Sequence, residues 1–165
     1  MAARDPADAI VALRSMRRRW RGLFAGLEED ESADALARRP GATGRSAVDH
    51  ARHATGALTL LDRALEQLVV DDDPVLDPAV AVASQRAWPS SDAAVDEAIE
   101  DLARAADRMA DRADRVSSGD WTRRGAVEGD GEVDALAVLW DAVDTVVADL
   151  RAAEATMREV RGSIS

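Results

Sequence analysis

The chain has 165 residues with a formal net charge of −11, it contains no cysteine, and all 21 of its basic residues are arginine. This length suits one domain that buries about two thirds of its unfolded surface. The negative charge argues against nucleic acid and anionic membranes as partners, since both would be repelled. Without cysteine there is no disulfide or thiol chemistry. No run of roughly 18 apolar residues is present and charged residues interrupt the N-terminal segment, so we expect a cytoplasmic protein with neither a transmembrane helix nor a signal peptide.

Apolar residues recur at spacings of three and four over four long segments, which predicts helices over residues 6–28, 46–70, 91–117 and 132–161. Asp5 followed by Pro6 is a start signal for the first helix, and Ser46 can cap the second. The acidic run 71–73, followed by proline, ends the second helix. Ser90 or Ser91 would cap the third.

The segments between these helices are polar or rich in proline and glycine. Residues 71–89 have no clear period and predict a long crossover with a short helical piece over 79–83. The glycine-rich segment 125–131 predicts a polar turn, with a small hairpin as an option. Four amphipathic helices and one long connection between the second and third predict an all-α four-helix bundle, with the whole chain 1–165 as one domain.

Charged side chains are expected on the outer faces of these helices. The third helix carries Glu100 with Arg104 and Asp111 with Arg115, at the spacing that allows ion pairs along one helix. The basic cluster 17–21 in the first helix points in several directions and does not form a one-sided patch. We expect it to face acidic partners such as Asp30 and Glu31 or residues of another helix.

His50 and His53 are the only histidines, and they lie three residues apart near the start of the second helix. That spacing places them side by side on one helical face, His50 in the apolar stripe and His53 toward its edge. Such a pair could share a ligand, a proton or a metal ion. Two partly buried histidines satisfied by neighbouring polar groups are the simpler alternative.

Four segments of the sequence resemble the DinB/YfiT-like superfamily, specifically the actinobacterial DinB-family and mycothiol-dependent maleylpyruvate isomerase-like proteins. They are RRWRGL at 18–23, SAVDHARH at 46–53, DDDP at 71–74 and VSSGDW at 116–121. Their order and spacing carry the resemblance over most of residues 10–150. It implies a DinB/YfiT-type four-helix bundle.

The resemblance also implies a divalent metal held by one histidine on the second helix and two more, one turn apart, on the fourth. His53 falls on the second-helix ligand position and His50 on a position that is often aromatic. The fourth helix departs from this pattern because it has no histidine. A site for zinc, nickel or iron would need Asp144 as a substitute ligand beside His50 and His53.

The remaining candidates concern a pocket and its chemistry. Trp88 and Trp121 lie in or beside loops, where they could close the bundle ends or wall a pocket, and Trp140 would fill the volume of a metal site. Either histidine beside a carboxylate could serve as a general acid or base. No nucleophile or oxyanion hole is evident, so no catalytic residue is assigned.

Together these observations predict a DinB-like bundle with a degenerate metal site and no cofactor, acting as a non-catalytic small-molecule-binding or structural protein. The first alternative is a metal-dependent transferase or isomerase that acts with a low-molecular-weight thiol such as mycothiol. The second is a protein–protein interaction module, and a homodimer remains an option.

Overall fold

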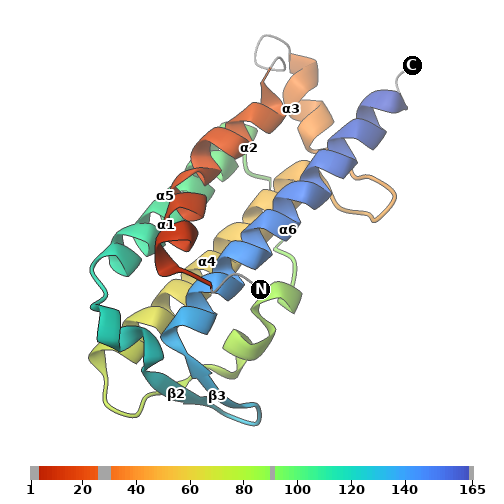
Figure 1. Ribbon diagram of the computed structural model, residues 1–165. Helices are drawn as coiled ribbons and strands as arrows, with labels where there is room; N and C mark the ends of the chain where they lie inside the picture. The colour runs from red at the N-terminus through yellow and green to blue at the C-terminus, as the bar shows by residue number, and fades with distance from the viewer. Residues whose placement is uncertain (1–3, 26–30, 90–91, 164–165) are drawn as a thin grey trace.

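The computed structural model describes residues 4–25, 31–89 and 92–163, and its long helices form a four-helix bundle (Figure 1). Helices α1 (Pro6–Arg14) and α2 (Met16–Phe24) follow one another in line and together make the first member of the bundle. The others are α4 (Ala47–Val70), α5 (Val95–Asp114) and α6 (Ala135–Gly162). The prediction of an all-α bundle with a long connection between its second and third helices is therefore confirmed.

The helix ends follow local signals with some differences from the sequence prediction. The Asp5 carboxylate accepts a hydrogen bond from the Ala7 N–H, and Ser46 forms a capping box with Asp49 at the start of α4. The first helix is broken at Ser15, whose hydroxyl donates to the Ala12 carbonyl and competes with the helical hydrogen bonds. Its predicted extension over 26–28 lies outside the described residues.

The third bundle helix begins later than predicted. Ser90 and Ser91 lie outside the described residues, and α5 starts at Val95 with Ala94 at the N-cap position. The predicted start at residue 91 is therefore wrong, because residues 92–94 are not helical. Ala94 has no capping side chain, and the Asp34 carboxylate of α3 accepts a hydrogen bond from the Val95 N–H at 3.3 Å instead. Acidic residues in the first turn of α5 add a favourable interaction with the helix dipole. The fourth bundle helix starts at Ala135, capped by Asp134, because residues 131–134 form a strand instead of a first helical turn.

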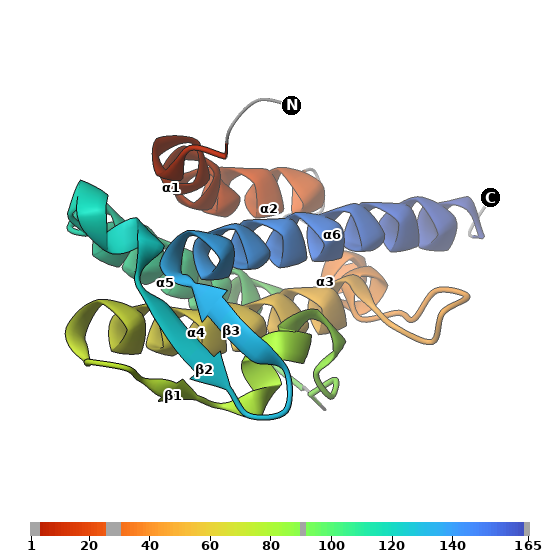
Figure 2. The same cartoon turned by 60° about the horizontal axis from the view of Figure 1, so that its bottom comes forward.

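The loops form a three-stranded sheet at one end of the bundle (Figure 2). β2 (Arg124–Val127) pairs antiparallel with β3 (Gly131–Asp134), which confirms the hairpin option, and β1 (Val75–Leu76) adds to β2 in parallel. Gly129 and Gly131 have positive φ, as the tight turn requires. The crossover also contains a 3-10 helix, η1 (Pro78–Gln85), over the predicted helical piece. A second 3-10 helix, η2 (Ser118–Thr122), follows α5, and a short helix, α3 (Glu31–Ala37), precedes α4.

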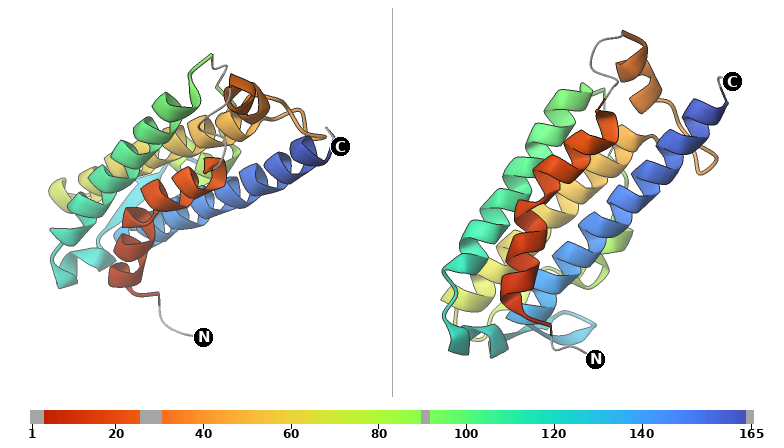
Figure 3. Two further views of the ribbon diagram at one scale, coloured as in Figure 1. Left: turned by 90° about the horizontal axis from the view of Figure 1, so that it is seen from above. Right: turned by 45° about the horizontal axis from the view of Figure 1, so that its top comes forward.

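A single apolar cluster fills the space between the bundle helices. α4 packs against both α5 and α6, and the α1–α2 member packs against α5 and α6 from the other side (Figure 3). Each helix supplies large side chains that are fully buried, and among them are Leu13, Met16, Trp20, Leu58, Leu61, Leu65, Leu102, Met109, Leu139 and Leu150. These large apolar side chains recur at helical spacing, as the sequence pattern predicted.

Most ion pairs of α5 join it to the neighbouring bundle helices, and the pair of Arg104 with Asp101 runs along α5 itself. Glu100 pairs with Arg17 and Arg21 of α2, and these hydrogen bonds, Arg17 first, lower the pKa of Glu100. Arg104 pairs with Asp101, and Asp111 pairs with Arg14 of α1. The predicted Glu100–Arg104 and Asp111–Arg115 pairs are therefore wrong, because acceptors on α5 have cationic partners on the neighbouring helix.

In the basic cluster of α2, Arg17 and Arg21 pair with Glu100 of α5. This confirms the expectation that the cluster faces acidic residues of another helix. The other alternative, Asp30 and Glu31, falls on side chains outside the described part of the chain. Between α4 and α5, the buried Asp62 carboxylate accepts from Arg112 at 2.7 Å. Arg17 and Arg112 carry raised pKa values because of these hydrogen bonds.

Candidate functional site

The two histidines occupy the first turns of α4 on the face that packs against α6. Both are buried, with His50 6% exposed and His53 3% exposed. The capping box at Ser46 fixes where α4 begins, and the spacing of three residues then places both imidazoles on one side of the helix. The prediction that the pair shares a face toward the core is confirmed.

Both imidazoles meet one buried carboxylate, that of Asp149 on α6. The His53 Nδ1 lies 2.7 Å from one Asp149 oxygen, and the His50 Nδ1 lies 3.3 Å from the other. Asp149 is itself only 6% exposed. Its two oxygens therefore serve two ring nitrogens, as expected for a polar group buried in a bundle core. We refer to these three residues as the His–Asp cluster.

The sequence prediction named Asp144 where the structure places Asp149. Asp144 has a side chain that is 55% exposed and pairs with Arg4 at 2.9 Å. Asp141, one turn before it, is half-buried, and burial raises its pKa, followed by repulsion from Asp144, with Arg4 opposing. Asp149 could have been found from its position next to Leu150 and three residues after Val146, both in the buried stripe of α6.

Trp88 covers the two imidazoles from the connection between η1 and α5. Its indole stacks on His53 with ring centroids 4.2 Å apart and meets the edge of His50 at 4.9 Å. The Arg45 guanidinium lies 4.8 Å from the centroid of the Trp88 ring on a cation–π contact. These contacts close the His–Asp cluster on the side that α4 and α6 leave uncovered.

The other two tryptophans of the predicted pocket have different surroundings. Trp121 is buried in η2, and Trp140 is half-buried on α6, with the Arg4 guanidinium 5.2 Å from its ring centroid. None of the described ring contacts joins either of them to the histidines. Of the three, Trp88 is the tryptophan that the structure brings to the predicted site.

Two buried polar atoms near the cluster lack hydrogen-bond partners among the described residues. They are the Nε2 of His53 and the hydroxyl of Thr145, which lies one turn before Asp149 on α6. Thr145 and Asp149 thus occupy two positions a turn apart on the helix that faces His53. An unpaired buried polar group costs about 1–3 kcal/mol, so the fold carries this cost at both atoms.

The side chains of the cluster are not arranged as metal ligands in the described part of the chain. Two imidazoles and a carboxylate are a sound donor set for zinc, nickel or iron. Here each Nδ1 is directed at a different oxygen of the same carboxylate, so the donors bind one another. Across residues 4–25, 31–89 and 92–163, no three histidine, aspartate or glutamate side chains are placed to hold a metal.

An open groove lies between α2 and α6, and it shares none of its lining residues with the His–Asp cluster. It has a volume of about 450 Å³, within the range of small-molecule sites. No helix in the described part of the chain is long and apolar enough to cross a membrane.

The fold and site together define a helical bundle with a buried polar cluster between its second and fourth members. No family model matches the chain, and no curated protein matches it. Among solved structures, the chain is similar to YfiT from Bacillus subtilis, which is described as a probable metal-dependent hydrolase with an unusual four-helix bundle topology. The TM-score is 0.64 at 10% identity, over 92% of this chain and 89% of YfiT.

At this identity, the likeness to YfiT shows a shared fold. The four-helix bundle that the sequence motifs implied is therefore confirmed as the fold, with the arrangement seen in YfiT. The actinobacterial and mycothiol-related subtype stays a prediction.

Proposed function

We propose that the protein is a metal-free DinB-like bundle that binds a small molecule and does not catalyse a metal-dependent reaction. The observation that supports this is the closed His–Asp cluster, in which both Nδ1 atoms are bonded to Asp149 and Trp88 covers the rings. In the superfamily that the sequence resembles, a second-helix histidine and two fourth-helix histidines a turn apart would hold the metal. In this chain His53 meets Asp149 on α6, and Thr145 lies one turn before Asp149 on the same helix.

In this proposal the cluster has a structural role. Its hydrogen bonds tie α4 to α6, and its contact with Trp88 ties the long crossover to the bundle. The Asp149 carboxyl group is tolerated in the core because each of its oxygens has a hydrogen-bond partner. Ligand binding is then assigned to the open groove between α2 and α6.

Proton transfer at His53 is a second candidate function. Its Nδ1 is held by a carboxylate at 2.7 Å while its Nε2 has no partner among the described residues. That arrangement orients an imidazole to act as a general base. The imidazole is 3% exposed and stacked under Trp88, so a substrate would have to displace the indole first.

Metal content separates the proposed function from the thiol-dependent and hydrolytic alternatives. Untagged protein is analysed by plasma mass spectrometry before and after incubation with zinc, nickel or iron, together with a His53→Ala variant. We expect far less than one metal ion per chain, with no difference between the two proteins. A stoichiometric metal that the variant loses would overturn the proposal and justify hydrolase and thiol-transfer assays.

For the second candidate, Trp88→Ala opens the cluster without touching its hydrogen bonds. Hydrolysis of an activated ester by this variant, lost again in Trp88→Ala/His53→Phe, would favour proton transfer at His53. Equal rates of ester hydrolysis in the two variants would exclude proton transfer at His53.

A further inference from the structure

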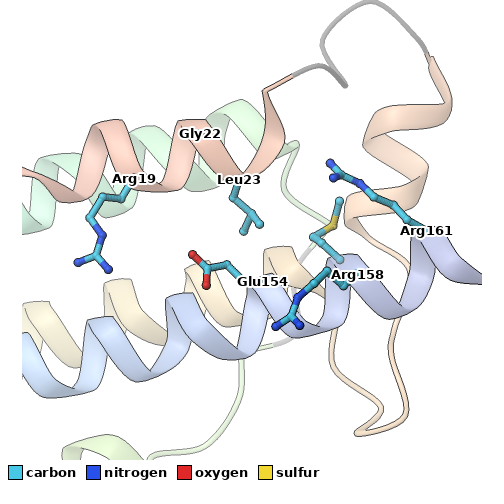
Figure 4. Close-up of a pocket in the computed structure, with 7 residues that line it drawn as sticks. Arg19, Gly22, Leu23, Glu154, Arg158 and Arg161 are labelled. Carbon is cyan, nitrogen blue, oxygen red and sulfur yellow. The ribbon is translucent and has the colours of Figure 1, made fainter.

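The groove between α2 and α6 is built from residues of opposite character. Its lining consists of Arg19, Gly22 and Leu23 from α2, and Glu154, Met157, Arg158 and Arg161 from α6. Figure 4 shows Arg19 and Leu23 extending from α2 toward α6, while Glu154 extends from α6 toward α2. The groove therefore has cationic side chains at its edges and apolar side chains between them.

The side chains of the three groove arginines have no ion-pair or hydrogen-bond partner among the described residues, and neither does the Glu154 carboxylate. On its α5 side, by contrast, α2 presents Arg17 and Arg21, both paired with Glu100. Three arginines and one glutamate give the groove a local formal charge of +2 in a chain whose net charge is −11. Charge of this sign that no protein group neutralises attracts an anion.

The floor of the groove is apolar. Met157 is 1% exposed and Leu23 is half-buried against the core. Gly22 adds no side chain, and a Cβ built at this position would meet no atom within 4 Å. No α2 side chain fills the groove at this position, which leaves room for an apolar chain to lie between the two helices.

We propose that this groove binds a single-chain carboxylate, with its head group on Arg158 and Arg161 and its apolar chain along Leu23 and Met157. This inference rests on the proposed small-molecule-binding function and adds its ligand class. A guanidinium presents a planar fork of donors that matches a carboxylate. Arg158 and Arg161 lie three residues apart on α6, so their stems leave neighbouring parts of the helix surface. Figure 4 shows their guanidinium groups on different sides of α6, and both side chains are exposed, so they reach a shared head group by rotating about their stems.

Glu154 restricts the charge of the ligand. Its carboxylate lies inside the groove between Arg19 and the two head-group arginines along α6 (Figure 4). A second negative charge on the ligand would be repelled by it. The groove is therefore selective for a monoanion over a dianion.

Octanoate is the probe, and its binding to the full chain is measured by isothermal titration calorimetry. Acetate lacks the apolar chain, and octyltrimethylammonium carries the opposite charge. We expect binding of octanoate alone. Octanoate that fails to bind, or octyltrimethylammonium that binds equally well, would overturn the proposal.

Charge variants test where octanoate binds. The double variant Arg158→Glu/Arg161→Glu is expected to weaken binding at least about tenfold, because two ion pairs become repulsions. Glu154→Gln is expected to bind octanoate more tightly. Arg151→Glu is the matched control, because Arg151 is an exposed α6 arginine outside the groove, and its affinity should change less than about threefold.

All of these substitutions are at exposed positions, and circular dichroism checks that each variant is folded. Equal affinity of the double variant and wild type, or weaker binding by Glu154→Gln, would refute the assigned site. This experiment is independent of the metal analysis. Metal bound at His53 would overturn the proposed function and leave the octanoate result intact, whereas absent octanoate binding would leave the metal-free cluster intact.

Discussion

Replacing Asp149 by leucine should be among the most destabilising single changes on α6. The substitution removes both acceptors of two buried imidazoles, whose Nδ1 atoms lie 2.7 and 3.3 Å from the carboxylate. Each unsatisfied buried group costs about 1–3 kcal/mol, which gives about 2–6 kcal/mol for the pair. Burial of the leucine side chain returns about 1.5–3 kcal/mol. The midpoints of these two ranges differ by about 2 kcal/mol, and this is the net loss that we expect in the free energy of unfolding.

Urea denaturation followed by far-UV circular dichroism measures this loss. Asp144→Leu is the matched control, because Asp144 lies on the same helix and makes an exposed ion pair with Arg4. Exposed pairs contribute about 0–1 kcal/mol, so the control should lose at most about 1 kcal/mol. A loss in Asp149→Leu no greater than that in Asp144→Leu would refute the interpretation that the hydrogen bonds of Asp149 to the two histidines stabilise the fold.

A double-mutant cycle separates the network from simple packing. His53→Phe keeps an aromatic ring beneath Trp88 and removes the ring nitrogens. Combined with Asp149→Leu, it should cost less than the sum of the two single variants, by about 0.5–3 kcal/mol, because each partner is already lost. Additive losses would show that His53 and Asp149 are energetically independent.

Three further outcomes are expected from urea or thermal denaturation of single variants. Gly125→Ala should lower the free energy of unfolding by about 1–3 kcal/mol, since its Cβ would lie 3.0 Å from the Pro74 carbonyl oxygen. At Gly56 the nearest atoms to an added Cβ belong to the flexible Arg86 guanidinium, so Gly56→Ala should be neutral or stabilising. Equal effects of the two substitutions would contradict this reasoning. Arg112→Met should lower the free energy of unfolding by about 2 kcal/mol, because it leaves the Asp62 carboxylate buried without its main partner. An unchanged free energy of unfolding would show that water replaces Arg112 as the partner of Asp62. Asp141→Asn should raise the free energy of unfolding by up to about 0.5 kcal/mol at pH 7. Because burial raises the folded-state pKa of Asp141, its ionised form destabilises the fold. The stability gained by the variant should vanish at acid pH, where Asp141 of the wild type becomes protonated. A gain in stability that is constant with pH would show that ionisation of Asp141 is not its cause.

Sequence periodicity predicted the helices and the inward face of the histidines, because both depend on spacing within one segment. Ser46 marked the start of α4 to within a residue, since an N-cap is a local hydrogen bond. The partner of the histidines was mispredicted as Asp144. Two carboxylates on α6 differ by five residues, and which one faces α4 depends on how the two helices are rotated against each other.

The ion pairs on α5 show the same division between local and tertiary information. Glu100 and Arg104 have the spacing of a pair within one helix, but Glu100 meets Arg17 and Arg21 of α2. A hydrogen-bonded arginine from a packed neighbour outcompetes a flexible, exposed pair along the helix. The groove of unpaired arginines was likewise invisible, because Arg19 and Arg158 are far apart in the chain and meet only when α2 lies beside α6.

The sequence by itself determined the fold class, the four long helices and the burial of both histidines, since apolar spacing and capping are read from neighbouring residues. The tertiary structure alone decided that Asp149 joins the histidines, that Trp88 covers them and that three arginines line one groove. These features depend on helix rotation and on the course of the crossover, which are fixed by the packing of the whole core.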